Sequence, residues 1–199
     1  MRNSRISLNK LFDSTDQAEL NMSADGCFAF YHYTHASHLS NILEEGLWAR
    51  REVACPQPPT HLSGTFLIEG FIDPYPDWLT QSKYYDDLGA LLTTQYIGEV
   101  LLEVSVPVHA FQIYIADYAH ILECKRLQDN KGTGIGFGYD CRDGKECTQA
   151  YVDSYVELGD YRNQHHAPIV QVVRRGEGMV VPHHYIKVSA SQPRNHDLT

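Results

Sequence analysis

The sequence predicts a single α+β domain whose strands and helices are interspersed without a regular repeat. Runs of β-branched residues, such as residues 97–108, are typical of buried strands. Other stretches, such as residues 36–47, place apolar side chains at helical spacing. These segments do not follow the strand–helix–strand order of a doubly wound parallel sheet. A length of 199 residues also agrees with one domain.

The first predicted unit is a strand followed by a helix. Residues 27–33 (CFAFYHY) form an aromatic run that suits a buried strand. Four apolar side chains share one face of the helix that follows: Leu39, Ile42, Leu43 and Leu47. Thr34 or Ser37 is expected to cap the start of this helix, and Gly46 suits its left-handed C-terminal residue.

The middle of the chain begins with residues 49–64, whose three prolines predict a loop. Residues 65–72 are short, apolar and strand-like. The turn Asp73-Pro-Tyr-Pro-Asp comes next, and Asp77 is expected to cap a helix over residues 78–92.

The second half of the chain holds most of the remaining predicted elements. Strands are expected over residues 97–108, 111–115, 168–173, 179–181 and 185–188. Helical segments are expected over residues 117–127 and 148–156, with a glycine-rich loop over residues 129–143 between them. The folded domain would span residues 26–189, between a flexible N-terminal tail (1–25) and a polar C-terminal tail (190–199).

The charge of the chain disfavours several classes of function. Asp and Glu (25) outnumber Lys and Arg (16), so the formal net charge is −9. Binding to nucleic-acid phosphates needs a basic face, which disfavours a nucleic-acid partner. The sequence shows no bilayer-spanning apolar run and no secretory signal peptide. We therefore expect a soluble monomer without membrane contact, either cytoplasmic or secreted into a host cell by a specialised system that reads the N-terminal tail.

The cysteines and the glycine-rich loop carry no strong motif. Five cysteines at irregular spacing favour reduced thiols over a disulfide framework. Cys141 and Cys147 have no second close pair, so no metal site is expected. A Cys–His hydrolase centred on Cys27 is an alternative, although Cys27 opens a strand and not a helix. The loop lacks the Gly-Lys-Ser/Thr ending of a phosphate-binding loop.

The segment from Phe30 to Leu47 carries the clearest functional pattern. His32 and Thr34 alternate onto one side of the predicted strand, while Tyr33 faces the other side. A histidine and a hydroxyl side by side can hydrogen-bond a ribose hydroxyl or a carboxamide. The alternative is a core histidine whose hydrogen bonds are satisfied within the protein.

This segment, a Tyr-His-Tyr-Thr strand and a helix ending in Gly-Leu, resembles the first motif of the ADP-ribosyltransferase superfamily, especially its DarT-type branch. Residues 174–188 (RRGEGMVVPHHYIKV) are similar to the closing element of that branch. In that element a Glu precedes a short apolar strand, then a proline, then an Ile-containing strand. The resemblance covers residues 30–48 and 168–188 and leaves the middle of the chain unmatched.

The resemblance implies an ADP-ribosyltransferase-like split β-sandwich with flanking helices, and NAD as a substrate. His32, Tyr33 and Thr34 would hold NAD, with His32 on the ribose at the nicotinamide side. Glu177 would be the catalytic carboxylate near the acceptor and the nicotinamide ribose, and His32 the other catalytic residue. Such a carboxylate stabilises the oxocarbenium-like ribose formed when the N-glycosidic bond breaks, or it deprotonates the acceptor. The alternative for Glu177 is a solvent-exposed loop acid.

The middle motif of the superfamily has no clear counterpart in this sequence. The remaining candidates for contact with NAD are Arg50 and Arg51 for the pyrophosphate, Tyr84 and Tyr85 for stacking on nicotinamide, and Ser63 with Thr65 as rivals of the tyrosines. Each of these residues also has a structural or solvated alternative.

The function that the resemblance implies is NAD-dependent mono-ADP-ribosylation. A protein acceptor with a basic face, such as host ubiquitin, suits the acidic charge of the chain, which would then be a bacterial effector or toxin. Three alternatives remain: DarT-like modification of single-stranded DNA, an NAD glycohydrolase, and a catalytically silent binding module of the same fold.

Overall fold

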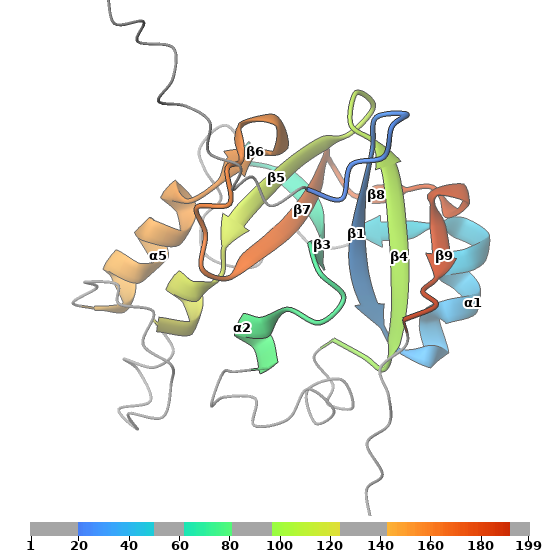
Figure 1. The fold of residues 1–199 in the computed structure, drawn as a ribbon, viewed down its shortest axis with the longest axis horizontal. Helices are drawn as coiled ribbons and strands as arrows, with labels where there is room; N and C mark the ends of the chain where they lie inside the picture. Colours follow the sequence, from blue (N-terminus) through green and yellow to red (C-terminus); the bar gives the residue numbers. More distant parts are fainter. Residues whose placement is uncertain (1–19, 50–61, 81–96, 124–142, 192–199) are drawn as a thin grey trace, which may run out of the picture.

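The computed structural model describes residues 20–49, 62–80, 97–123 and 143–191, which form a mixed fold dominated by one antiparallel sheet (Figure 1). Seven strands make up this sheet in the order β6-β5-β7-β3-β1-β4-β9. Their bounds are β1 (Cys27–Thr34), β3 (Thr65–Phe71), β4 (Val100–Pro107), β5 (Gln112–Asp117), β6 (Val156–Glu157), β7 (Pro168–Arg175) and β9 (Ile186–Val188). The prediction of an α+β fold is confirmed at this level.

A two-stranded ribbon and a few short helices accompany the sheet. The ribbon pairs β2 (Leu47–Ala49) with β8 (Gly178–Val181). The named helices are α1 (Ala36–Glu45), α2 (Asp77–Thr80) and α5 (Gly144–Asp153), with 3-10 turns η3 (Leu158–Asp160) and η4 (His183–Tyr185). None of the helices in the described ranges is long and apolar enough to cross a membrane.

The main core lies on the sheet face to which Phe28 and Phe30 of β1 point. Both side chains are fully buried, because alternate residues of a strand share one face. Their cluster includes Leu102, Val104 and Val106 of β4, Ile68 of β3, and Val170 and Val172 of β7. Leu47 and Val181 of the ribbon belong to the same cluster, so the ribbon covers this face of the sheet.

The sheet is partly split between β1 and β3. β1 pairs with β4 along its whole length, but its described register with β3 has one position, Tyr31 opposite Phe71. Figure 1 shows the two strands diverging from one another. Gly70 allows the close approach at the meeting point, because a Cβ there would lie 2.5 Å from Phe30 Cδ2. The gap between the strands begins next to His32.

The start of α1 differs from the prediction. His35 occupies the N-cap position and makes no side-chain capping hydrogen bond. The carboxylate of Glu99 takes this role, since its Oε1 accepts a hydrogen bond from the Ala36 N–H at 3.0 Å. The prediction of a Thr34 or Ser37 cap is therefore wrong, and Thr34 belongs to β1.

The boundaries of α5 also differ from the prediction. The helix begins at Gly144, four residues before the expected start, because the Asp143 side chain accepts hydrogen bonds from the N–H groups of Lys145 and Glu146. It ends at Asp153, and Val156 belongs to β6.

The N-terminal boundary lies slightly before the expected one. Ala29 N–H donates to the Asn21 carbonyl at 2.9 Å, and Asn21 Nδ2 donates to the Ile72 carbonyl at 2.7 Å. The chain is thus tied to β1 before residue 26. Most of both predicted tails, most of the predicted helix 78–92 and most of the glycine-rich loop lie outside the described residues.

Candidate functional site

His32 lies in the gap between β1 and β3. Its Nδ1 is 2.7 Å from the backbone carbonyl of Glu69 on β3, so the ring bridges the two strands. A carbonyl can only accept, so Nδ1 carries the hydrogen and Nε2 is left as an acceptor. Burial among protein atoms lowers the pKa of His32, outweighing the hydrogen bond to Glu69, so the ring is neutral at pH 7. The side chain is partly exposed, which leaves it accessible to a ligand.

The carboxyl group of Glu69 extends from the face of β3 that Phe71 occupies, whereas His32 shares its face of β1 with Phe28 and Phe30. The residue is exposed to solvent, yet surrounding protein removes enough hydration to raise the pKa of its carboxyl above the ordinary value. The position is therefore recessed but open to water. A carboxyl with these properties is a candidate for proton transfer.

Gln171 of β7 lies directly opposite Glu69 in the strand register and is fully buried. Its Nε2 donates to the Tyr151 hydroxyl at 2.8 Å and lies 3.4 Å from Glu69 Oε1. Its Oε1 has no hydrogen-bond partner. Burial raises the pKa of Tyr151 well above the ordinary value, so its hydroxyl stays neutral. This network fixes the amide beside the Glu69 carboxyl.

The other two residues of the predicted motif are buried. The Tyr33 hydroxyl donates to the Pro74 carbonyl, and its ring packs edge-on against Phe71 with centroids 5.8 Å apart. Thr34 ends β1 with 6% of its surface exposed. These contacts hold the loop after β3 against β1, and His32 is the member of the motif with the greater access to solvent.

Glu177 lies in the turn between β7 and β8 and is exposed. Arg175, two residues before Glu177, pairs with Thr65 at the start of β3. His32 contacts the backbone of Glu69, which lies four residues further along the same strand. Four residues of strand span about 13 Å. The described contacts do not bring Glu177 and His32 together, and their joint action stays a prediction. Along the chain Glu177 is followed by the short strand β8, by Pro182 and by β9. The resemblance to the closing element of the DarT-type branch predicts this order.

The remaining predicted contacts to NAD are only partly described. Ser63 is exposed in the turn before β3, and the buried Thr65 hydroxyl donates to the Leu62 carbonyl at 2.6 Å. Arg50, Arg51, Tyr84 and Tyr85 lie outside the described residues. Their roles stay predictions.

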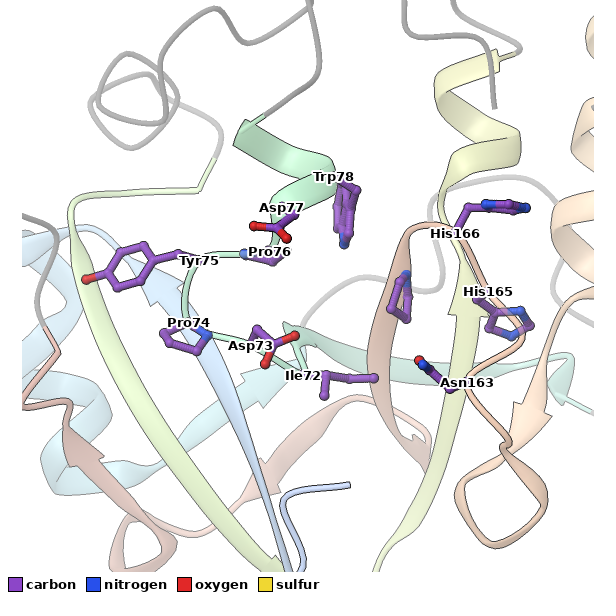
Figure 2. Close-up of a pocket in the computed structure, with 11 residues that line it drawn as sticks. Ile72, Asp73, Pro74, Tyr75, Pro76, Asp77, Trp78, Asn163, His165 and His166 are labelled. Carbon is purple, nitrogen blue, oxygen red and sulfur yellow. The ribbon is translucent and has the colours of Figure 1, made fainter. Parts of the chain in front are cut away.

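A cavity of about 580 Å³ lies beyond the C-terminal end of β3 and the N-terminal end of β7 (Figure 2). Asp73 and the α2 residues Asp77 and Trp78 line it from one side, and His165 and His166 line it from the other. Of the predicted site residues that the structure describes, none lines this cavity. The sequence signals that mark it are the Asp-Pro-Tyr-Pro-Asp segment, which we interpreted as a turn, and the adjacent histidines at positions 165 and 166.

Aromatic side chains connect this cavity to the surroundings of Glu69. Trp78 packs against Phe71, with centroids 5.8 Å apart, and Phe71 shares a strand face with Glu69. Trp78 also contacts Tyr118, which contacts Tyr151, the partner of Gln171. The cavity and the Glu69 carboxyl therefore lie along one face of the sheet.

Asp117 holds the segment that carries the two cavity histidines. This carboxylate is 2% exposed and accepts hydrogen bonds from the N–H groups of Ala119, His166 and Ala167 at 2.9–3.1 Å. His165 Nδ1 lies 3.9 Å from it, and burial lowers the pKa of His165 despite this negative charge. In the described residues no three metal-ligating side chains gather into a cluster.

Comparison of the chain with protein-family models, with curated proteins and with solved structures gave no match.

Proposed function

We propose that this protein is an NAD-dependent mono-ADP-ribosyltransferase that modifies a protein acceptor. The observation that carries the proposal is the place of His32. It belongs to the segment that resembles the first superfamily motif, and it lies where β1 and β3 separate. Its neutral ring has one nitrogen occupied by Glu69 and the other free to accept a hydrogen bond from a ribose hydroxyl.

The reaction needs a carboxylate in addition to a group that holds the ribose. When the bond from C1′ to nicotinamide breaks, nicotinamide leaves with the electron pair and the ribose acquires oxocarbenium character. A nearby negative charge stabilises that state. The resemblance assigns this role to Glu177.

A protein acceptor with a basic surface fits the charges of the molecule. The chain carries a formal net charge of −9, and the exposed Asp73 and Asp77 line the cavity next to this region. The negative charge of these two carboxylates would attract a basic partner and repel a phosphate backbone. DNA modification is the weaker alternative for the same reason.

The acceptor class can be tested with NAD labelled on its adenine. We expect label to appear on proteins when the enzyme and labelled NAD are added to a host-cell extract, and intact-mass analysis of ubiquitin tests one named candidate. Single-stranded DNA in a parallel reaction should stay unlabelled. Label on DNA alone would contradict the protein acceptor, and free ADP-ribose as the sole product would identify a glycohydrolase.

A further inference from the structure

We propose that the cavity beyond the C-terminal end of β3 binds an arginine side chain within a peptide segment. The guanidinium would lie on the carboxylate of Asp73, and a backbone carbonyl of the same segment would accept a hydrogen bond from the indole of Trp78. This would give the proposed basic acceptor a defined site on the protein. Binding at this site is measured without NAD, so it holds or fails separately from the proposed function.

The charge of the cavity wall favours a cationic ligand. The described lining residues include the carboxylates of Asp73 and Asp77 and no lysine or arginine. Within the described ranges Asp73 is exposed and makes no hydrogen bond or ion pair, and Figure 2 shows its carboxylate turned toward the cavity. His165 adds no positive charge at pH 7, because burial lowers its pKa. A guanidinium suits a carboxylate better than an ammonium does, since its planar N–H groups can bind both oxygens.

Two prolines hold the carboxylates in place before a ligand binds. Pro74 and Pro76 restrict the backbone between Asp73 and Asp77, because the proline ring fixes φ. The Pro74 carbonyl also accepts a hydrogen bond from the Tyr33 hydroxyl, which ties the segment to β1. A preorganised site loses less conformational freedom on binding, which favours affinity.

The indole of Trp78 is a second feature that points to a ligand. Its Nε1 is buried and has no hydrogen-bond partner in the described structure. Figure 2 shows this nitrogen on the edge of the ring that faces the cavity. The ring is held by Phe71 and Tyr118, with centroids 5.8 and 6.2 Å away. A buried donor without a partner is unfavourable, so an acceptor at this edge would stabilise the site.

The two contacts together favour a peptide over a simple amine. A guanidinium carries donors only and cannot satisfy the indole N–H. An arginine within a peptide supplies both the cation and a carbonyl acceptor. The cavity volume of about 580 Å³ falls within the ~300–1,000 Å³ range of ligand pockets. Neutral sugars, whose hydroxyls donate and accept, are the competing occupants, and the net charge of −9 favours the cation.

Titration with N-acetyl-arginine N-methylamide in the absence of NAD tests the site directly. The chain has two tryptophans, so a Trp48→Phe background leaves Trp78 as the sole tryptophan reporter. We expect a saturable change in its fluorescence with the arginine probe. The citrulline analogue has the same shape without the charge, and it should bind about fivefold more weakly, the upper value for an exposed ion pair.

Variants in the same background separate the two contacts. Asp73→Asn removes the charge and keeps the shape, so the Kd for the arginine probe should rise about fivefold, and added salt should weaken binding when Asp73 is present. Glu44→Gln removes one exposed negative charge on α1 and is the matched control, with an unchanged Kd. Trp78→Phe, followed by isothermal titration, keeps an aromatic ring without the donor and should also raise the Kd about fivefold.

Several outcomes would overturn the inference. Equal binding of the arginine and citrulline probes contradicts it, as does an unchanged Kd in Asp73→Asn or in Trp78→Phe. The absence of saturable binding by both fluorescence and isothermal titration also contradicts it. Binding of methyl glucoside in place of the arginine probe would assign the cavity to sugars. If the arginine probe binds as expected and NAD is not cleaved, the site stands and the proposed function alone fails.

Discussion

Asp117→Ala is expected to lower the free energy of unfolding by about 3–5 kcal/mol, the usual effect of breaking a buried charged network. The substitution removes the acceptor for the N–H groups of Ala119, His166 and Ala167, which lie around a carboxylate that is 2% exposed. Those donors would lose their partner where water has little access. The segment that brings His165 and His166 to the cavity would lose its anchor.

Urea unfolding followed by circular dichroism measures this loss. Asp117→Asn keeps one carbonyl acceptor and should cost less than the alanine variant. Asp73→Ala, at an exposed carboxylate that lines the same cavity, should change stability by no more than about 0.5 kcal/mol. A loss below about 1 kcal/mol for Asp117→Ala would show that the carboxylate does not hold this segment.

His32→Ala is expected to weaken NAD binding about tenfold, the effect of losing one hydrogen bond of about 1.4 kcal/mol. The ring that bridges β1 and β3 presents Nε2 as an acceptor, and alanine leaves nothing in its place. The fold should survive, because the side chain is only partly buried and one hydrogen bond to Glu69 is lost.

Isothermal titration with NAD, together with thermal unfolding, tests this expectation. His38→Ala, an exposed histidine on α1, is the matched control and should bind NAD like the wild type. Unchanged NAD affinity with a large fall in melting temperature would instead identify His32 as a core residue.

Local patterns in the sequence were sufficient to predict most strands. β4 lies inside the predicted segment 97–108, because its β-branched residues favour a strand, and its buried Leu102, Val104 and Val106 alternate with partly exposed residues. β1, β3 and β7 follow the apolar runs in the same way. The short strand β2 was missed because its partner β8 lies about 130 residues later in the chain.

Long-range contacts also explain what the sequence did not reveal about the site. The cap of α1 is Glu99, 63 residues from Ala36, which no local capping rule identifies. Glu69 and Gln171 are polar residues within two apolar strands, and this isolated polarity is the signal that could have singled them out. Their juxtaposition depends on the register of β3 and β7, which became visible only in the fold.

The most direct test of the central claim is the release of nicotinamide from NAD, followed over time by chromatography. The purified wild-type protein, with an acceptor protein identified by the labelled-NAD experiment, should release nicotinamide in proportion to the enzyme added. The His32→Ala variant should need a higher NAD concentration to reach half of its maximal rate. Release no faster than in buffer alone, at saturating NAD and with acceptor present, would contradict the claim that this fold cleaves NAD.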